Sequence, residues 1–179
     1  GYLAYTAPHW PLQAHESDIA KYAETYRTGP DALRQWRFER LKEIGLIPAS
    51  AKLPQLDPTV SEEAKQAKKE RNEQWMRTYA AMIDCVDQNI ARIVDTLRKR
   101  GQLDNTLILF LSDNGSDEVR GPLWGQLCNT PFRKFKVWVH DGGVASPFIA
   151  HWPAGIPASQ RGKIVTGLAH IMDVFPTCL

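Results

Sequence analysis

An unbroken run of apolar residues that ends in a polar turn constrains the fold of this chain more than any other feature. Leu107–Leu111 are all large and apolar, and the sequence then reads Ser-Asp-Asn-Gly. A short apolar run bounded by turn residues is typical of a buried strand, here over Thr106–Ser112. Because the strand ends in a carboxylate and an amide, it presents two oxygen donors at its carboxyl end, where open α/β sheets place their ligand sites.

A long amphipathic helix is predicted immediately before this strand. Thr59 and Glu62 have the spacing of a capping box, and Gly101, which follows three basic residues, is typical of a helix end. Apolar residues recur at steps of three and four in its second half, namely Met82, Val86, Ile90, Ile93 and Leu97. Helix, short loop and buried strand in this order predict an α/β fold, a layered sheet with flanking helices.

Shorter elements are predicted on both sides of this unit. Helices are expected over Asp18–Arg27, capped by Ser17, and over Asp31–Ile44, and Asp173 is expected to cap a last helix. Strands are expected in four apolar stretches, YLAYTA (2–7), VWV (137–139), FIAHW (148–152) and GKIVTGLAHI (162–171). Since both ends of the chain fall inside apparent secondary structure, residues 1–179 are expected to be part of a larger domain.

Composition and charge exclude several classes of protein. The formal net charge of +2 gives no reason to expect nucleic acid or an anionic membrane as a partner. No apolar run approaches the roughly 20 residues that a transmembrane helix needs. Cys85, Cys128 and Cys178 are widely spaced and show no C-x-x-C pattern, so neither a zinc site nor a disulfide framework is predicted.

Asp113 and Asn114 are candidate metal ligands. A carboxylate beside an amide carbonyl suits a hard divalent cation such as calcium. An EF-hand loop is excluded, because Glu118 stands where that loop needs glycine and Trp124 where it needs its last acidic ligand. Asn-Gly is also a common hairpin signal. Taken alone, the motif leaves a plain turn without a ligand as the alternative.

Two other stretches carry candidate binding groups. His9 lies in APHWPL, where it is either an ordinary loop residue or a pocket histidine that contacts an oxyanion or protonates a leaving group. In NTPFRKFKVWVHDGG, the side chains of Arg133, Lys134 and Lys136 are either surface charge or hold an anionic substrate. The glycine pair at 142–143 permits a tight turn that brings main chain close to a site.

The order of these segments along the chain closely resembles the sulfatase family. The resemblance is carried by YLAYTAPHWPLQA, YAAMIDCVDQNIARIVDTLRKRGQLDNTLILFLSDNG, NTPFRKFKVWVHDGGVASPFIAHWPAGI and HIMDVFPT. These segments cover nearly the whole chain. They are similar to the later part of the sulfatase catalytic domain, which belongs to the alkaline-phosphatase-like α/β superfamily.

The resemblance implies roles for four residues. Asp113 and Asn114 match the second pair of calcium ligands, and His9 and Lys136 match the two residues that contact the sulfate group. Asp141, before the glycine pair, is expected to have a structural role. Many family members have a glycine where this chain has Ser116, a departure that bears on the shape of the loop.

The rest of a sulfatase site is expected outside this chain. Sulfatases use a formylglycine nucleophile made from a C-x-P-x-R type motif, with a first Asp pair for the metal and a Lys and a His beside the nucleophile. None of these has a match here. Cys128 has one residue too many before Pro131 and lies downstream of the metal strand, so we do not expect it to be the nucleophile.

The function implied by the resemblance is calcium-dependent hydrolysis of a sulfate ester through a covalent nucleophile. This chain alone is expected to be inactive. A phosphodiester or phosphonate ester hydrolase of the same superfamily is one alternative, and a non-catalytic binding protein that keeps the fold is another. A periplasmic, secreted or lysosomal setting is suggested by the family alone, and the sequence specifies neither the particular ester nor the oligomeric state.

Overall fold

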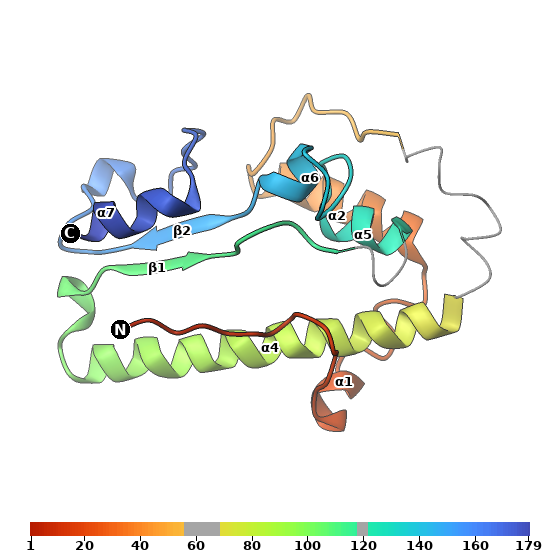
Figure 1. Cartoon of the computed structure of the whole chain (residues 1–179), viewed down its shortest axis with the longest axis horizontal. Coiled ribbons are helices and arrows are strands. Elements are labelled where there is room, and N and C mark those ends of the chain that lie inside the picture. The colour runs from red at the N-terminus through yellow and green to blue at the C-terminus, as the bar shows by residue number, and fades with distance from the viewer. Residues whose placement is uncertain (56–68, 118–121) are drawn as a thin grey trace.

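The computed structural model of the chain describes residues 1–55, 69–117 and 122–179. Its longest element is the helix α4 (Lys69–Lys99), which runs beside a sheet made of β1 (Ile108–Leu111) and β2 (Phe148–His151) (Figure 1). The shorter helices α2 (Pro30–Glu43) and α5 (Pro122–Cys128) pack together at one end of α4. The short helix α7 (Val174–Cys178) lies near the far end of the sheet.

Helix α4 confirms the amphipathic pattern predicted for its sequence. Met76, Ala80, Ala81 and Met82 are buried, while the apolar residues of its last turns are only half-buried. The helix ends after Arg98 and Lys99, and Gly101 adopts a φ of +65°, the left-handed conformation that glycine tolerates best after a helix. The predicted capping residues Thr59 and Glu62 lie outside the described residues.

Of the two helices predicted near the N-terminus, one has nearly its predicted range and the other is shorter than predicted. Helix α2 matches its prediction closely, with Pro30 at its first position and Gly45 at a φ of +74° just after it. The helix expected over Asp18–Arg27 is instead α1 (Glu16–Ala20), and turns follow it. The predicted cap was wrong, because His15 occupies the N-cap position and makes no side-chain cap hydrogen bond.

An ion pair and an aromatic cluster join these helices to α4. The Lys21 ammonium lies 2.7 Å from Asp18 and 2.8 Å from Asp84 on α4. Its hydrogen bonds lower the pKa of both carboxyl groups, and the Asp18 contact raises the pKa of Lys21. Near α2 and α5 the buried cluster contains Met76, Trp124 and Leu127, with Tyr26, Leu33 and Tyr79 packed against it. Met76, Trp124 and Leu127 thus form a small hydrophobic core at this corner.

Two of the predicted strands form and pair in a sheet, but β1 is not buried as predicted. β1 and β2 pair antiparallel, with Ile108 opposite His151 and Leu111 opposite Phe148. The strands are shorter than predicted, and β1 is not buried, since Phe110 is 42% exposed. The predicted α/β layered sheet is therefore met only in part. The described residues form a small mixed helix and strand unit with a two-stranded sheet.

The other three predicted strands are absent from the described part of the chain. YLAYTA and GKIVTGLAHI are irregular and largely exposed, because no neighbouring strand satisfies their main-chain hydrogen bonds. VWV lies in a turn, where Val137 has a φ of +76° that is incompatible with a strand. Asp173 occupies the N-cap position of α7, as predicted, but its side chain makes no cap hydrogen bond there; the carboxylate accepts a hydrogen bond of 2.7 Å from the His170 N–H.

None of the helices in the described ranges combines the length and the apolar composition that a bilayer span requires.

Candidate active site at the end of strand β1

The turn after β1 carries the two predicted metal ligands. The Ser112 hydroxyl donates a hydrogen bond of 3.0 Å to the Asn114 carbonyl, which closes the turn. The Asn114 amide donates one of 2.8 Å to Oδ2 of Asp113, so the two side chains lie side by side. Asp113 is exposed and Asn114 is half-buried. The pair therefore lies where the sequence places it, at the carboxyl end of a strand.

Main-chain hydrogen bonds join this turn to the segment that contains the predicted sulfate-binding lysine. The N–H of Lys136 donates to the carbonyl of Ser116 at 3.0 Å, and the N–H of Gly115 donates to the carbonyl of Gly143 at 3.0 Å. A further bond of 3.0 Å runs from Gly142 to the carbonyl of Arg133. Residues 115–116 are thus held against the loop formed by residues 129–143.

Glycine is required where these segments meet. A Cβ on Gly115 would lie 1.9 Å from the carbonyl oxygen of Gly142, and one on Gly142 would lie 2.1 Å from that of Lys134. Both distances are far below any contact that real Cβ atoms make. The predicted tight turn at the glycine pair is the single helical turn α6 (Asp141–Val144). Its close packing against the turn after β1 explains why a side chain cannot be accommodated here.

Asn129 ties the same segments together, and nothing in the residue spacing predicted it. Its Oδ1 accepts a hydrogen bond of 2.9 Å from the Ser116 N–H, and its Nδ2 donates to the Ser116 carbonyl at 3.0 Å. Nδ2 also donates to the Gly125 carbonyl of α5 at 2.7 Å. The only signal in the sequence was the place of Asn129 at the start of NTPFRKFKVWVHDGG. A polar contact between distant segments leaves no periodic pattern to detect.

The three basic residues of this loop have different surroundings. Arg133 is exposed and Lys136 is half-buried. Lys134 is buried, and its ammonium lies 4.4 Å from the ring centre of Trp138 in a cation–π contact. Its φ of +66° is uncommon for a residue with a side chain. Lys134 is therefore not ordinary surface charge, and Lys136 is the lysine whose main chain contacts the turn after β1.

His9 is held on the N-terminal segment. Its Nδ1 donates a hydrogen bond of 2.9 Å to the Trp10 carbonyl, and its main-chain N–H donates one of 2.8 Å to the Thr6 carbonyl. The Trp10 ring packs edge-on against Trp75 of α4, with ring centres 5.3 Å apart. Hydrogen bonds therefore bring the segments of Asp113, Asn114 and Lys136 together, whereas His9 is fixed by contacts of its own.

Asp113 and Asn114 fit a calcium ion in donor chemistry, although they form only part of a ligand set. Calcium prefers carboxylate and amide oxygens and takes about six to eight of them, more than two residues supply. Within the ranges that the structure describes, no cluster of three or more His, Cys, Asp or Glu side chains could hold a metal ion. Further ligands would have to come from other segments.

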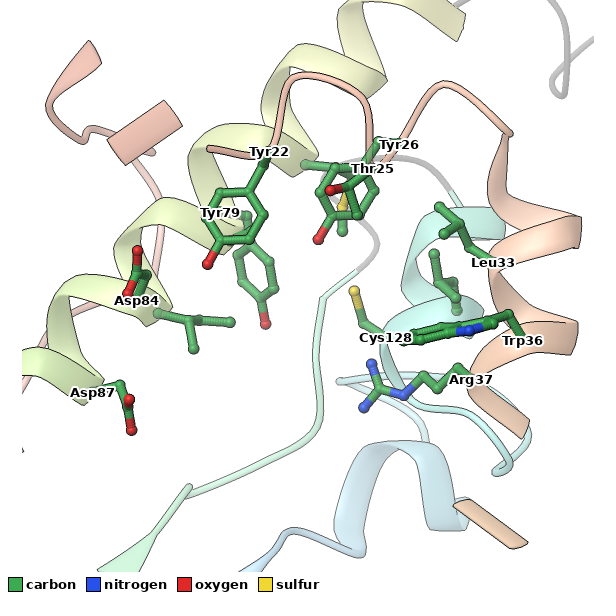
Figure 2. Close-up of a pocket in the computed structure, with 14 residues that line it drawn as sticks. Tyr22, Thr25, Tyr26, Leu33, Trp36, Arg37, Tyr79, Asp84, Asp87 and Cys128 are labelled. Carbon is green, nitrogen blue, oxygen red and sulfur yellow. The ribbon is translucent and has the colours of Figure 1, made fainter. Parts of the chain in front are cut away.

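A hollow of about 420 Å³ lies apart from this turn, between α2, α4 and α5 (Figure 2). The aromatic residues Tyr22, Trp36 and Tyr79 are among those that line it, and Arg37, Asp84 and Asp87 add charge. Tyr26 also lines it, and burial raises the pKa of this phenol to about 12. Cys128 lines the same hollow, whereas His9, Asp113, Asn114 and Lys136 do not.

Comparison with known proteins identifies the class to which this chain belongs. The sulfatase family model matches residues 2–179, and the chain therefore belongs to the sulfatase family. It is 33% identical to an uncharacterized sulfatase of Schizosaccharomyces pombe, over 99% of this chain and 38% of the relative. It is 30% identical to an arylsulfatase of Klebsiella aerogenes, over 98% of this chain and 44% of the relative.

A solved structure supports the same assignment. The crystal structure of Ps i-CgsB in complex with k-i-k-neocarrahexaose superposes with a TM-score of 0.59 and 30% identity, over 98% of this chain and 27% of that chain. The chain spans about two fifths of the length of the two curated relatives that it matches. The described elements are thus part of a sulfatase fold, as the resemblance predicted.

Proposed function

We propose that this chain is part of an enzyme that hydrolyses sulfate esters. Membership of the sulfatase family and the similarity to an arylsulfatase support this reaction. The structural observation that carries the proposal is the hydrogen bond from the Lys136 N–H to the Ser116 carbonyl. This bond holds the main chain of the basic segment against the turn with the two proposed oxygen ligands, which supports a site for an anion beside a divalent cation.

The residues of this turn and loop have separate roles in the proposed reaction. Asp113 and Asn114 hold calcium, which when bound offsets negative charge on the sulfate oxygens. Lys136 contributes a positive charge to the same sulfate group, and this favours the transition state if charge increases there. Lys134 is engaged with Trp138 and supports the loop from within.

His9 is the proposed second contact to the sulfate group. Because its Nδ1 donates to the Trp10 carbonyl, the neutral ring has Nε2 as a hydrogen-bond acceptor. Donation from Nε2 to a sulfate oxygen, or to the departing alcohol, therefore needs the protonated ring. The hydrogen bond to the Trp10 carbonyl occupies Nδ1, which leaves Nε2 as the atom proposed to contact the sulfate group.

The nucleophile is proposed to lie in another segment of the enzyme, as a formylglycine. The first Asp pair of the metal site belongs to that segment as well. Cys128 is not proposed as the nucleophile, since it lines the hollow between α2, α4 and α5, which none of the four proposed site residues lines. Residues 1–179 alone are therefore expected to lack turnover.

The proposal is tested by assaying the complete enzyme that contains this chain, produced in a host that makes formylglycine. Release of 4-nitrophenol is measured from 4-nitrophenyl sulfate and from bis(4-nitrophenyl) phosphate. We expect hydrolysis of the sulfate ester in preference to the phosphate diester. We also expect no activity above background in the Asp113→Ala variant or in residues 1–179 alone.

Three results would contradict parts of this proposal, each in a different way. Faster hydrolysis of the phosphate diester would support the phosphodiester alternative within the superfamily. A folded, formylglycine-containing enzyme that hydrolyses neither ester would support a binding protein that keeps the fold. Turnover by residues 1–179 alone would show that the nucleophile lies inside this chain.

A further inference from the structure

The side-chain amide of Asn129 pairs with the main chain of Ser116 as a neighbouring strand would. It accepts from the Ser116 N–H at 2.9 Å and donates to the Ser116 carbonyl at 3.0 Å. Its second donor contact is the Gly125 carbonyl at 2.7 Å, in the helix α5. Both functional ends of the amide are therefore used in contacts with main chain, and the side chain is anchored on a helix.

The Ser116 carbonyl is the point at which this network meets the proposed site. It accepts hydrogen bonds both from Nδ2 of Asn129 and from the main-chain N–H of Lys136. Asn114 lies two residues earlier along the chain. One side chain thus links α5, the turn with the proposed calcium ligands and the loop with the proposed sulfate-binding lysine.

The packing around Asn129 leaves little freedom for this arrangement to vary. A Cβ on Gly115 would lie 2.9 Å from Oδ1 of Asn129, and Gly115 also donates its N–H to Gly143. The amide therefore lies directly against the main chain that leads to Asn114. Loss of the amide would leave the Ser116 N–H without the acceptor it has here, and would free residues 115–116 to move relative to α5.

We propose that Asn129 is a positioning residue of the sulfate-ester site. It fixes the Asp113-Asn114 pair relative to Lys136 without touching the substrate or the metal. The inference rests on the proposed function, because the two groups it aligns are the proposed calcium ligands and the proposed sulfate contact.

The chain offers a matched control in Asn89. The Asn89 amide donates to the carbonyl of Cys85, four residues earlier, at 2.8 Å, as Asn129 does to Gly125. Asn89 lies on α4 and has no part in the proposed site. Alanine at Asn89 therefore removes the same local hydrogen bond, and alanine at Asn129 removes in addition the pair with Ser116.

The experiment compares Asn129→Ala, Asn129→Asp and Asn89→Ala in the complete enzyme. Hydrogen exchange measures the exchange rates of the Ser116 and Lys136 amides, and calorimetry measures calcium affinity. Assays with 4-nitrophenyl sulfate measure kcat and KM. For Asn129→Ala we expect faster exchange at both amides. We also expect roughly tenfold weaker calcium binding and a fall in kcat of roughly tenfold with a smaller change in KM.

Asn129→Asp tests the acceptor separately from the donors, and hydrogen exchange at Ser116 and Lys136 shows for either variant whether the two segments remain joined. Asn129→Asp keeps an acceptor for the Ser116 N–H but brings a carboxylate against the carbonyls of Ser116 and Gly125, so we expect losses at least as large as those of alanine. For Asn89→Ala we expect wild-type values for site-amide exchange, calcium affinity and kcat.

Two results would overturn the positioning role. One is an Asn129→Ala enzyme whose thermal stability falls while calcium affinity and kcat match those of Asn89→Ala, since Asn129 would then be structural only. The other is unchanged exchange at Ser116 and Lys136. A wild-type enzyme that neither binds calcium nor hydrolyses sulfate esters would refute the proposed function instead, and the exchange measurements would still show whether Asn129 holds the two segments together.

Discussion

The main-chain N–H of Lys136 donates a hydrogen bond of 3.0 Å to the carbonyl of Ser116. These residues belong to segments that α5 separates in the sequence. The bond joins the turn after β1 to the basic loop, residues 129–143. The hydrogen bond between Gly115 and Gly143 and those of the Asn129 amide join the same two segments.

The first prediction concerns the two proposed calcium ligands. In the complete enzyme, Asp113→Ala should weaken calcium binding by roughly a hundredfold, and Asn114→Ala by roughly tenfold, because a carboxylate contributes more than a neutral carbonyl to binding a divalent ion. Titration calorimetry measures both values. Asp104→Ala, an exposed carboxylate near the other end of β1, is the control and should bind calcium normally. Unchanged binding in Asp113→Ala would exclude this residue as a ligand.

The second prediction concerns the basic loop. Lys136→Ala should reduce kcat for sulfate-ester hydrolysis by roughly a hundredfold, since it removes the charge that we propose stabilises the transition state. Arg133→Ala, at an exposed position in the same loop, should have a much smaller effect. Lys134→Ala should act mainly through stability, because it removes the contact with Trp138. Equal small effects of all three on turnover would exclude a special role for Lys136 in the reaction.

The third prediction concerns the contact between Gly115 and Gly142. Gly115→Ala should destabilise the complete enzyme by about 1–3 kcal/mol, because its Cβ must displace main chain rather than a flexible side chain. Gly167→Ala is the control, since its Cβ would meet only Val165 Cγ1 at 3.9 Å. Denaturant unfolding of both variants measures the difference. If the two substitutions had equal effects, the segments would not pack as closely as the structure shows.

The fourth prediction concerns pH and the ion pair between Lys21 and α4. The hydrogen bonds of Lys21 lower the pKa of Asp18 and Asp84 below the ordinary value of 3.8. A lowered carboxyl pKa contributes stability above the unfolded-state value, and this contribution is lost as the pH falls through the folded-state value. Wild type should therefore be more stable than Lys21→Met near neutral pH, and the difference should begin to shrink as the pH falls below 3.8, towards the lower folded-state pKa values.

Thermal midpoints of both proteins between pH 3 and pH 7 test this fourth prediction. Arg40→Met is the control, because it removes an exposed pair with Glu43 inside α2 and leaves the connection between α1 and α4 intact. A difference between wild type and Lys21→Met that stayed constant down to pH 3 would assign the effect to packing of the lysine side chain instead.

Local signals in the sequence were sufficient for several elements. Apolar periodicity predicted the second half of α4, and Gly101 marked its end, because both depend on residues within a few turns of one helix. Pro30 and Gly45 predicted where α2 begins and ends for the same reason. The apolar run and its polar end located β1 and the turn with Asp113 and Asn114. The order of these segments was also sufficient to recognise the sulfatase family.

Contacts between distant segments decided the rest. The expected strands at YLAYTA and GKIVTGLAHI did not form, because a strand needs a partner for its hydrogen bonds and propensity alone does not supply one. Only folding shows that Lys134 is buried against Trp138, while the main chain of Lys136 joins the turn after β1. Only folding gives Asn129 its partners. A single side-chain amide that hydrogen-bonds to the main chain of a distant segment leaves no repeating pattern in the sequence. The sequence by itself thus determined the family and the residues at the end of β1, whereas the tertiary structure decided which side chains and main-chain groups hold them in place.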